Sequence, residues 1–107
     1  MGRAKGSRRE QAWRNRAARL LREEGLLRGS VSARWRVCGK AGCRCAQGRR
    51  HAAMYVVYRE AGRTTQIYVP KEWGERVRRW VKRYGEVREL LEKLSGLYEA
   101  RVRQRRD

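Results

Sequence analysis

The chain has 107 residues, the length of one small domain, and carries 29 Lys and Arg against 11 Asp and Glu, a formal net charge of +18. A charge of this size is typical of proteins that bind a polyanion, because phosphates relieve the self-repulsion of a compact basic chain. Ten of the acids are Glu and there is a single His, which disfavours the aspartate clusters of metal-dependent phosphoryl transfer. We therefore expect a protein that is not an enzyme.

The location expected from the sequence is cytoplasmic, with no membrane partner. No run approaches the roughly 18 apolar residues of a membrane span, and no apolar segment follows the basic N-terminus to form a secretory signal. The three cysteines are crowded into residues 38–45, a spacing that favours reduced thiols over a disulfide framework. The excess of 24 Arg over 5 Lys has a second interpretation, a GC-rich or thermophilic genome.

The first predicted elements are a flexible basic arm over residues 1–8 and a helix from about Arg9 to Leu27. Residues 1–52 hold 15 basic and 3 acidic residues, against 14 and 8 in residues 53–107, so the N-terminal half is the more basic. The apolar side chains expected on one side of the helix are Trp13, Ala17, Leu20 and Leu21.

Three strands are predicted next, joined in an antiparallel sheet. Residues 31–37 alternate between apolar and polar types, with Arg34 and Arg36 on the open face and Trp35 on the buried side. Residues 54–58 are β-branched and aromatic, and residues 63–69 form a partner strand across a turn at residues 60–62. Pro70 ends the third strand.

A long C-terminal helix follows Pro70, and its apolar residues recur at alternating steps of four and three, as in a coiled-coil seam. Two arrangements would cover such a seam: the N-terminal helix packs antiparallel along it, or two copies of the chain pair through its distal half. A break near Gly85 is a further alternative. The single domain then spans residues 9–100, before a basic tail over residues 101–107. The seam residues are Trp73, Val77, Trp80, Tyr84, Val87, Leu91, Leu94 and Tyr98.

All three cysteines and the one histidine lie within fourteen residues, as Cys38, Cys43, Cys45 and His51. Three thiolates and one imidazole form a standard tetrahedral ligand set for structural zinc. A bound ion would also supply folding free energy that a small, poorly buried domain lacks. We predict a structural Zn²⁺ knuckle between the first and second strands.

Other interpretations of this segment remain open. The spacing C-x4-C-x-C-x5-H differs from the paired C-x2-C pattern of zinc ribbons, so the cysteines could instead be small buried side chains or redox-active thiols. Catalytic zinc is disfavoured because all four ligands would be occupied by protein. A cysteine nucleophile activated by His51 lacks an orienting third group.

The same segment resembles a family of small uncharacterised prokaryotic proteins catalogued as a domain of unknown function, whose members often occur near transposase-like or other mobile-element genes. The resemblance covers about residues 28–98 and implies an architecture and a genomic neighbourhood, without an activity. After His51 the family usually continues Gly-Pro-Tyr, whereas this chain continues Ala52-Ala53-Met54-Tyr55. The residues that carry it are Cys38-Gly39-Lys40, Cys43-Arg44-Cys45, Gly48, His51, and Tyr68 to Glu72 before a Leu-rich helix.

Basic residues interleaved with aromatics are typical of nucleic-acid surfaces, because guanidinium groups bind phosphates while aromatic rings stack on bases. Tyr55 or Tyr58, whichever points outward, is the stacking candidate; the tryptophans are expected in the core. For any single arginine, a solvated charged face is the alternative. The candidate contacts are Arg34, Arg36, Lys40, Arg44, Arg49 and Arg50 along the first strand and knuckle, and Arg76, Arg78, Arg79, Lys82 and Arg83 on the long helix.

The sequence thus predicts an α+β fold with an N-terminal helix, a three-stranded antiparallel sheet with a zinc knuckle and a long C-terminal helix. The predicted function is non-catalytic binding of DNA or RNA, mainly through phosphates, as an accessory protein of a mobile-element or nucleoprotein system. The expected location is the nucleoid or a ribonucleoprotein. The alternative is a scaffold or adaptor that docks a larger enzyme or a ribonucleoprotein through its C-terminal helix, which could also form a homodimer.

Overall fold

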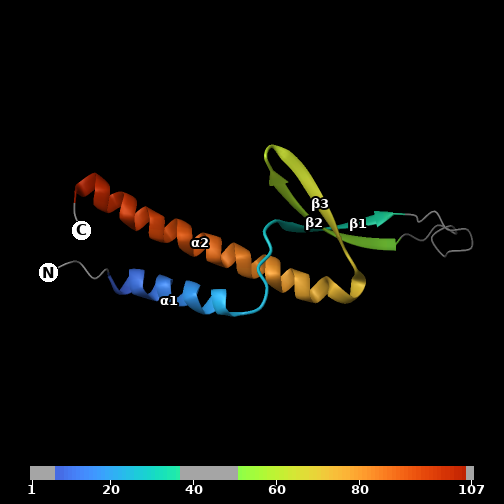
Figure 1. Ribbon diagram of the computed structural model, residues 1–107, viewed down its shortest axis with the longest axis horizontal. Coiled ribbons are helices and arrows are strands. Elements are labelled where there is room, and N and C mark those ends of the chain that lie inside the picture. Colours follow the sequence, from blue (N-terminus) through green and yellow to red (C-terminus); the bar gives the residue numbers. More distant parts are fainter. Residues whose placement is uncertain (1–6, 37–50, 106–107) are drawn as a thin grey trace, which may run out of the picture. The chain divides into compact units, whose positions relative to one another are not determined.

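The computed structural model describes residues 7–36 and 51–105, and these form the predicted α+β architecture (Figure 1). Two compact units are present: residues 27–81, here called the sheet unit, and residues 1–26 with 82–107, here called the helical unit. The element order is α1 (Arg8–Arg22), β1 (Ser30–Arg36), β2 (His51–Glu60), β3 (Arg63–Val69), the short 3-10 helix η2 (Lys71–Trp73) and α2 (Gly74–Gln104). No described helix is long and apolar enough to cross a membrane.

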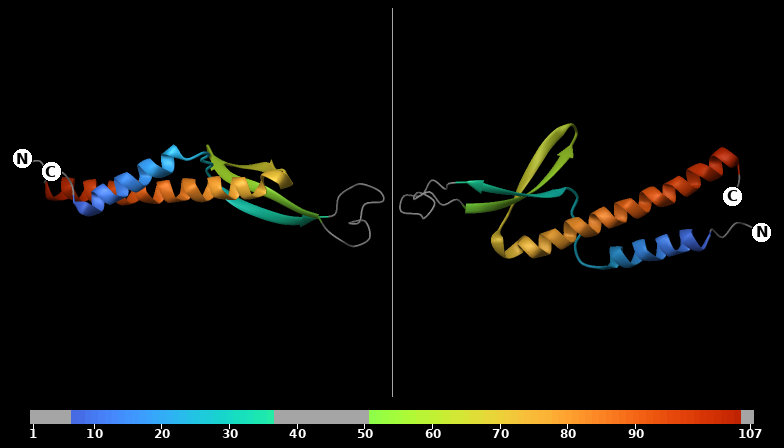
Figure 2. Two further views of the ribbon diagram at one scale, coloured as in Figure 1. Left: turned by 90° about the horizontal axis from the view of Figure 1, so that it is seen from below. Right: turned by 180° about the vertical axis from the view of Figure 1, so that it is seen from behind.

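The sheet is antiparallel in the order β1-β2-β3, as predicted, and Figure 2 shows its twist from two further directions. Ala61 and Gly62 both have positive φ angles, of 52° and 79°, which suits the two-residue turn of a tight hairpin between β2 and β3. The third strand has the predicted bounds. The second begins earlier than expected, at His51, so the residues that depart from the family pattern, Ala52 to Tyr55, belong to this strand.

The core of the sheet unit lies between the sheet and the first turns of α2. Alternate residues of a strand point to opposite faces, so Val56, which is fully buried, shares its face with Met54. Val69 and Val77 complete the buried cluster. Gly29 makes the close approach of the chain to this core possible: its φ is +118°, and a Cβ there would lie 2.7 Å from the carbonyl oxygen of Val57.

In the helical unit, α1 begins with Ser7, whose hydroxyl oxygen accepts a hydrogen bond from the Glu10 amide at 3.1 Å. Ion pairs run from Arg16 to Glu86 and from Glu23 to Arg83, so α1 lies antiparallel to α2. This is one of the two arrangements predicted for the distal half of the long helix. The buried residues between the two helices are Ala17, Leu20, Val87 and Leu90, with Trp13 packed against them.

Four details of the helices differ from the predictions, the first being that α1 ends at Arg22 and not near Leu27. Leu21 was expected on the buried side of α1 but is 56% exposed, because the single neighbouring helix covers only a narrow stripe. The α2 helix continues through Gly85 without the alternative break. It also includes Arg101 to Gln104, so the first part of the predicted basic tail is helical.

The predicted coiled-coil seam is only partly the buried face of α2 in the helical unit. Of the seam residues there, Val87 is buried and Leu94 half-buried, but Tyr84, Leu91 and Tyr98 are 36%, 56% and 43% exposed, whereas Leu90, outside the seam, is buried. The face against α1 is therefore displaced to one side of the predicted seam. Leu90 and the half-buried Leu97 each lie one residue before a seam position, Leu91 and Tyr98. The α1 helix packs on Leu90, and the tyrosine rings of the seam lie at the edge of this contact.

The predicted zinc knuckle falls on residues 37–50, which lie outside the described residues. Of the predicted ligands, His51 is described only as the first residue of β2, with Arg36 as its register partner. Among the residues that the structure describes, no three His, Cys, Asp or Glu side chains are grouped so that they could hold a metal ion.

Candidate nucleic-acid interface

The outer face of the sheet carries a pair of tyrosines. Tyr55 and Tyr68 are register partners on β2 and β3, and their ring centroids lie 5.8 Å apart in an edge-to-face arrangement with an interplanar angle of 69°. They alternate with the buried Val56 and Val69, so they lie on the face away from the core. The Tyr68 side chain is 59% exposed, which leaves much of its ring open to a stacking partner.

Tyr58, the second stacking candidate, lies on the other side of the strand and is half-buried. The Arg28 guanidinium covers its ring at 4.3 Å from the centroid and forms an ion pair with Glu60 at 3.0 Å. Hydrogen bonds to Glu60 and Tyr58 raise the pKa of Arg28, so the cation is held in place. Of the two sequence candidates, Tyr55 is therefore the outward one.

Sequence reasoning missed Tyr68. The position of the hairpin turn could have indicated it. With the turn centred on Ala61 and Gly62, the antiparallel register pairs Tyr55 with Tyr68. A cross-strand pair of aromatic side chains is a favourable contact in an antiparallel sheet. The pair could thus have been predicted from the turn position alone.

Most of the described cations of the sheet unit form no ion pair with a described residue. Its sequence holds 13 Lys and Arg against 3 Glu. Apart from Arg28, the cations of this unit whose side chains the structure describes form no ion pair with any described residue, although Arg59 donates a hydrogen bond to the Gly62 carbonyl oxygen at 3.1 Å. The exposed members of this set are Arg59, Arg63, Lys71, Arg76, Arg78 and Arg79, here called the unpaired cations.

The predicted cluster on the long helix is divided by the structure. Arg76 stacks over Trp73 at 4.4 Å from the ring centroid, and Trp73 is 41% exposed although the sequence assigned it to the core. Arg83 forms an ion pair with Glu23 at 3.1 Å and donates a hydrogen bond to the Gly25 carbonyl oxygen at 2.8 Å. Its guanidinium group therefore stabilises the fold. Arg79 and Lys82 are exposed, as a contact surface requires.

The remaining candidates are described only in part. Lys40, Arg44, Arg49 and Arg50 lie outside the described residues, together with the three cysteines. Arg34 and Arg36 occupy positions in β1 opposite Ala53 and His51, at the end of the sheet where the predicted knuckle joins the two strands.

In the helical unit, the buried carboxylate of Glu10 holds two arginines. Glu10, 3% exposed, accepts hydrogen bonds from Arg14 at 3.0 Å, from the Tyr98 hydroxyl at 2.8 Å and from Arg101 at 2.5 Å. Arg101, Tyr98 and Arg14 together lower the pKa of Glu10 from 4.5 to about 2, since each hydrogen bond favours the carboxylate. Arg8, Arg19 and Arg22 on α1 are exposed and form no ion pair with any described residue, so exposed positive charge is present in both units.

Comparison with known proteins gives one match, to the family described as Domain of unknown function (DUF6788), over residues 7–79. The chain belongs to this family. The match includes α1, the whole sheet and the start of α2. It therefore begins and ends earlier than the resemblance noted from the sequence, which covers about residues 28–98. No curated protein and no solved structure matches the chain.

Proposed function

We propose that this DUF6788 protein is a non-catalytic nucleic-acid-binding protein that contacts DNA or RNA mainly through phosphates. The observation that carries the proposal is the sheet face with Tyr55 beside the exposed Tyr68, in a unit whose described cations are largely unpaired. An aromatic platform with phosphate-binding cations around it is the arrangement that single strands require. A role as an accessory factor of a mobile element or nucleoprotein remains part of the proposal.

Fluorescence anisotropy with labelled oligonucleotides tests this function. The full chain is titrated into a 12-nucleotide single strand, as DNA and as RNA, at low salt. We expect binding of at least one of them, and reversal of two unpaired cations, Arg63→Glu and Arg79→Glu, should weaken it. A chain that binds neither strand at about 50 mM salt, where phosphate contacts are strong, would refute the proposed function.

We further propose that Cys38, Cys43, Cys45 and His51 hold a structural Zn²⁺. In favour of this, Arg36 and His51 are register partners at the end of the β1–β2 pair, so the sheet brings the two ends of the cysteine segment together. Cys38 follows Arg36 by only two residues. The thiolates and imidazole are the donor types that zinc prefers.

Metal analysis of the purified chain tests the zinc proposal. We expect about one zinc per chain, lost in Cys43→Ser together with a drop in the melting temperature. Lys40→Ser is the matched control, since it alters the same segment without removing a ligand. A metal-free wild-type chain that folds as stably as a zinc-supplemented sample would contradict this assignment.

A second candidate function is a scaffold that docks a larger enzyme through α2. It is favoured by the exposed apolar row of Tyr84, Leu91 and Tyr98, with Val102 beyond it. Under this hypothesis Leu91→Asp abolishes recovery of a protein complex from cells while oligonucleotide binding is retained. Loss of nucleic-acid binding in Leu91→Asp, with the fold intact, would contradict it.

A further inference from the structure

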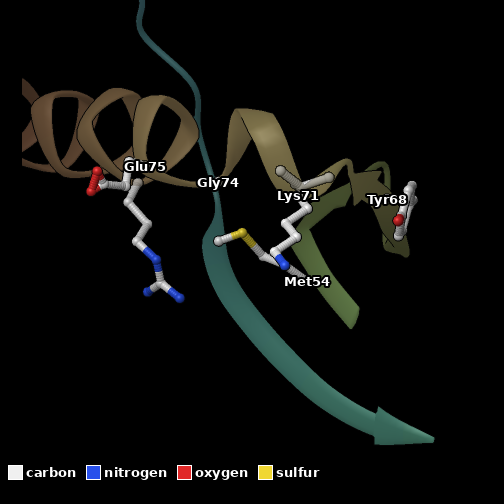
Figure 3. Close-up of a pocket in the computed structure, with 7 residues that line it drawn as sticks. Met54, Tyr68, Lys71, Gly74 and Glu75 are labelled. Carbon is white, nitrogen blue, oxygen red and sulfur yellow. The ribbon is translucent and has the colours of Figure 1, made fainter. Parts of the chain in front are cut away.

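A pocket of about 450 Å³ opens at the corner where β3 leads through η2 into α2. Its volume falls in the range of roughly 300–1,000 Å³ that is typical of small-molecule sites. Figure 3 shows Met54 and Lys71 at the centre of this pocket, with Tyr68 at one side and Glu75 at the other. All of its lining residues belong to the sheet unit.

The lining divides into an apolar part and a charged part. Met54, Val69 and Gly74 supply the apolar surface, and the absence of a side chain at Gly74 keeps the space above the Met54 thioether open. A Cβ at Gly74 would lie 3.6 Å from the Met54 methyl carbon and 3.7 Å from its sulfur. A flat apolar group therefore finds an apolar floor, with Tyr68 also in the lining.

The charged part favours an anion. Lys71 and Arg78 both line the pocket, and neither forms an ion pair with any residue that the structure describes. The one carboxylate in the lining, Glu75, leaves a net charge of +1. Two unpaired cations beside an aromatic ring match a ligand that joins a phosphate to a planar base.

We propose that this pocket binds one unpaired nucleotide, with its phosphate at Lys71 and Arg78 and its base over Met54, at the edge that Tyr68 borders. The inference rests on the proposed function and deepens it, since a nucleotide can enter the pocket only when its base is unpaired. The chain should therefore prefer single strands to duplexes. The same chemistry is present in a free mononucleotide, which the experiment below distinguishes from a strand.

The two methionines of the chain offer a direct probe, because Met54 lines the pocket and the only other methionine is Met1. The full chain carries ¹³C-methyl methionine, and Met54→Leu assigns the signals. A 12-nucleotide single strand should shift the Met54 signal, and the matching duplex should not. If dTMP alone shifts it at micromolar concentration, the site takes free nucleotides, and the strand as ligand source is wrong.

Matched variants test the pocket through affinity. Gly74→Leu fills it without a change of charge and should lower the preference for single strand over duplex about fivefold or more, the effect of one stacked base. Gly74→Ala, which adds one methyl group at an ordinary contact distance, should keep most of the preference. Arg78→Glu should lower the preference for single strand over duplex. Arg79→Glu, at the neighbouring position, should lower the affinity for single strand and duplex by the same factor. The Arg78 and Arg79 pair decides the matter if Gly74→Leu fails to fold.

The two proposals fail in different ways. If wild-type chain binds neither strand nor duplex, the proposed function itself is wrong. If it binds single strands but the Met54 signal stays in place, or Gly74→Leu and Arg78→Glu keep the full preference, the pocket is not the nucleotide site while the sheet face still is.

Discussion

Replacing Tyr68 by Ala is the substitution that best separates an effect on nucleic-acid affinity from an effect on stability. Its side chain is 59% exposed, so Tyr68→Ala leaves no cavity and removes only the edge contact with Tyr55. A cross-strand pair of this kind contributes about 0.2–1 kcal/mol to folding. One base stacked on an aromatic side chain contributes about 1–3 kcal/mol to binding, which corresponds to roughly 5- to 150-fold in the dissociation constant. Binding should thus suffer far more than stability.

The assay for Tyr68→Ala is anisotropy with a 12-nucleotide single strand, next to a thermal melt of each variant. Tyr68→Phe keeps the ring and should bind within about twofold of wild type, since stacking needs the aromatic face and not the hydroxyl. Tyr84→Ala is the matched control: Tyr84 is also exposed but lies on α2 in the helical unit. Wild-type affinity in Tyr68→Ala, or an equal loss in Tyr84→Ala, would refute the reasoning.

Three further predictions concern stability. Gly29→Ala should destabilise the chain in urea by more than about 2 kcal/mol, because a Cβ would meet the Val57 carbonyl oxygen at 2.7 Å in a positive-φ conformation; a neutral result would contradict the close approach. Gly85→Ala should stabilise α2 by up to about 1 kcal/mol, since a Cβ there meets nothing within 4 Å, and a loss of stability would argue against a continuous helix. The pKa of Glu10 is lowered from 4.5 to about 2, so its contribution is complete above about pH 4.5 and is lost as the pH falls toward 2. Glu10→Gln should lack this part of the acid-induced drop in melting temperature, and identical pH profiles would be the contrary result.

Much of the fold was predictable because local patterns and tertiary packing agree. The two-residue alternation and the turn at Ala61–Gly62 gave the hairpin, and Pro70 marked the end of β3. The bounds of β3 could be predicted because a turn precedes the strand and a proline follows it. The long helix was predictable from its apolar spacing and its helix-favouring residues, which outweigh the exposed glycines at 85 and 96.

The heptad interpretation was right only in part, for a physical reason. A three-four repeat records that apolar residues share one side of a helix, but the partner decides which neighbouring row is buried. Here α1 packs on Val87, which belongs to the predicted seam, and on Leu90, which does not, while the seam residue Leu91 remains 56% exposed. The sequence could not supply this choice, because both rows carry leucine.

The candidate site was predictable in composition but not in detail. The excess of basic residues is visible in the sequence, but which of them form ion pairs is not. Arg28 pairs with Glu60 and Arg83 with Glu23, whereas Arg79 forms no ion pair with a described residue. Such pairing depends on which carboxylates the fold brings close. The pocket at Gly74 likewise depends on the meeting of β2, β3 and α2, which no local pattern encodes.

The most direct test of the central claim, that this chain binds nucleic acid through the phosphate contacts of its unpaired cations, is the salt dependence of single-strand affinity. Five phosphates contacted by Arg59, Arg63, Lys71, Arg78 and Arg79 would give a slope of log affinity against log salt near about −3.5, using roughly 0.7 per phosphate for a single strand. Affinity should then fall about 100-fold between roughly 50 and 200 mM salt, and more steeply if further cations take part. Binding that stays constant over this range would contradict the account.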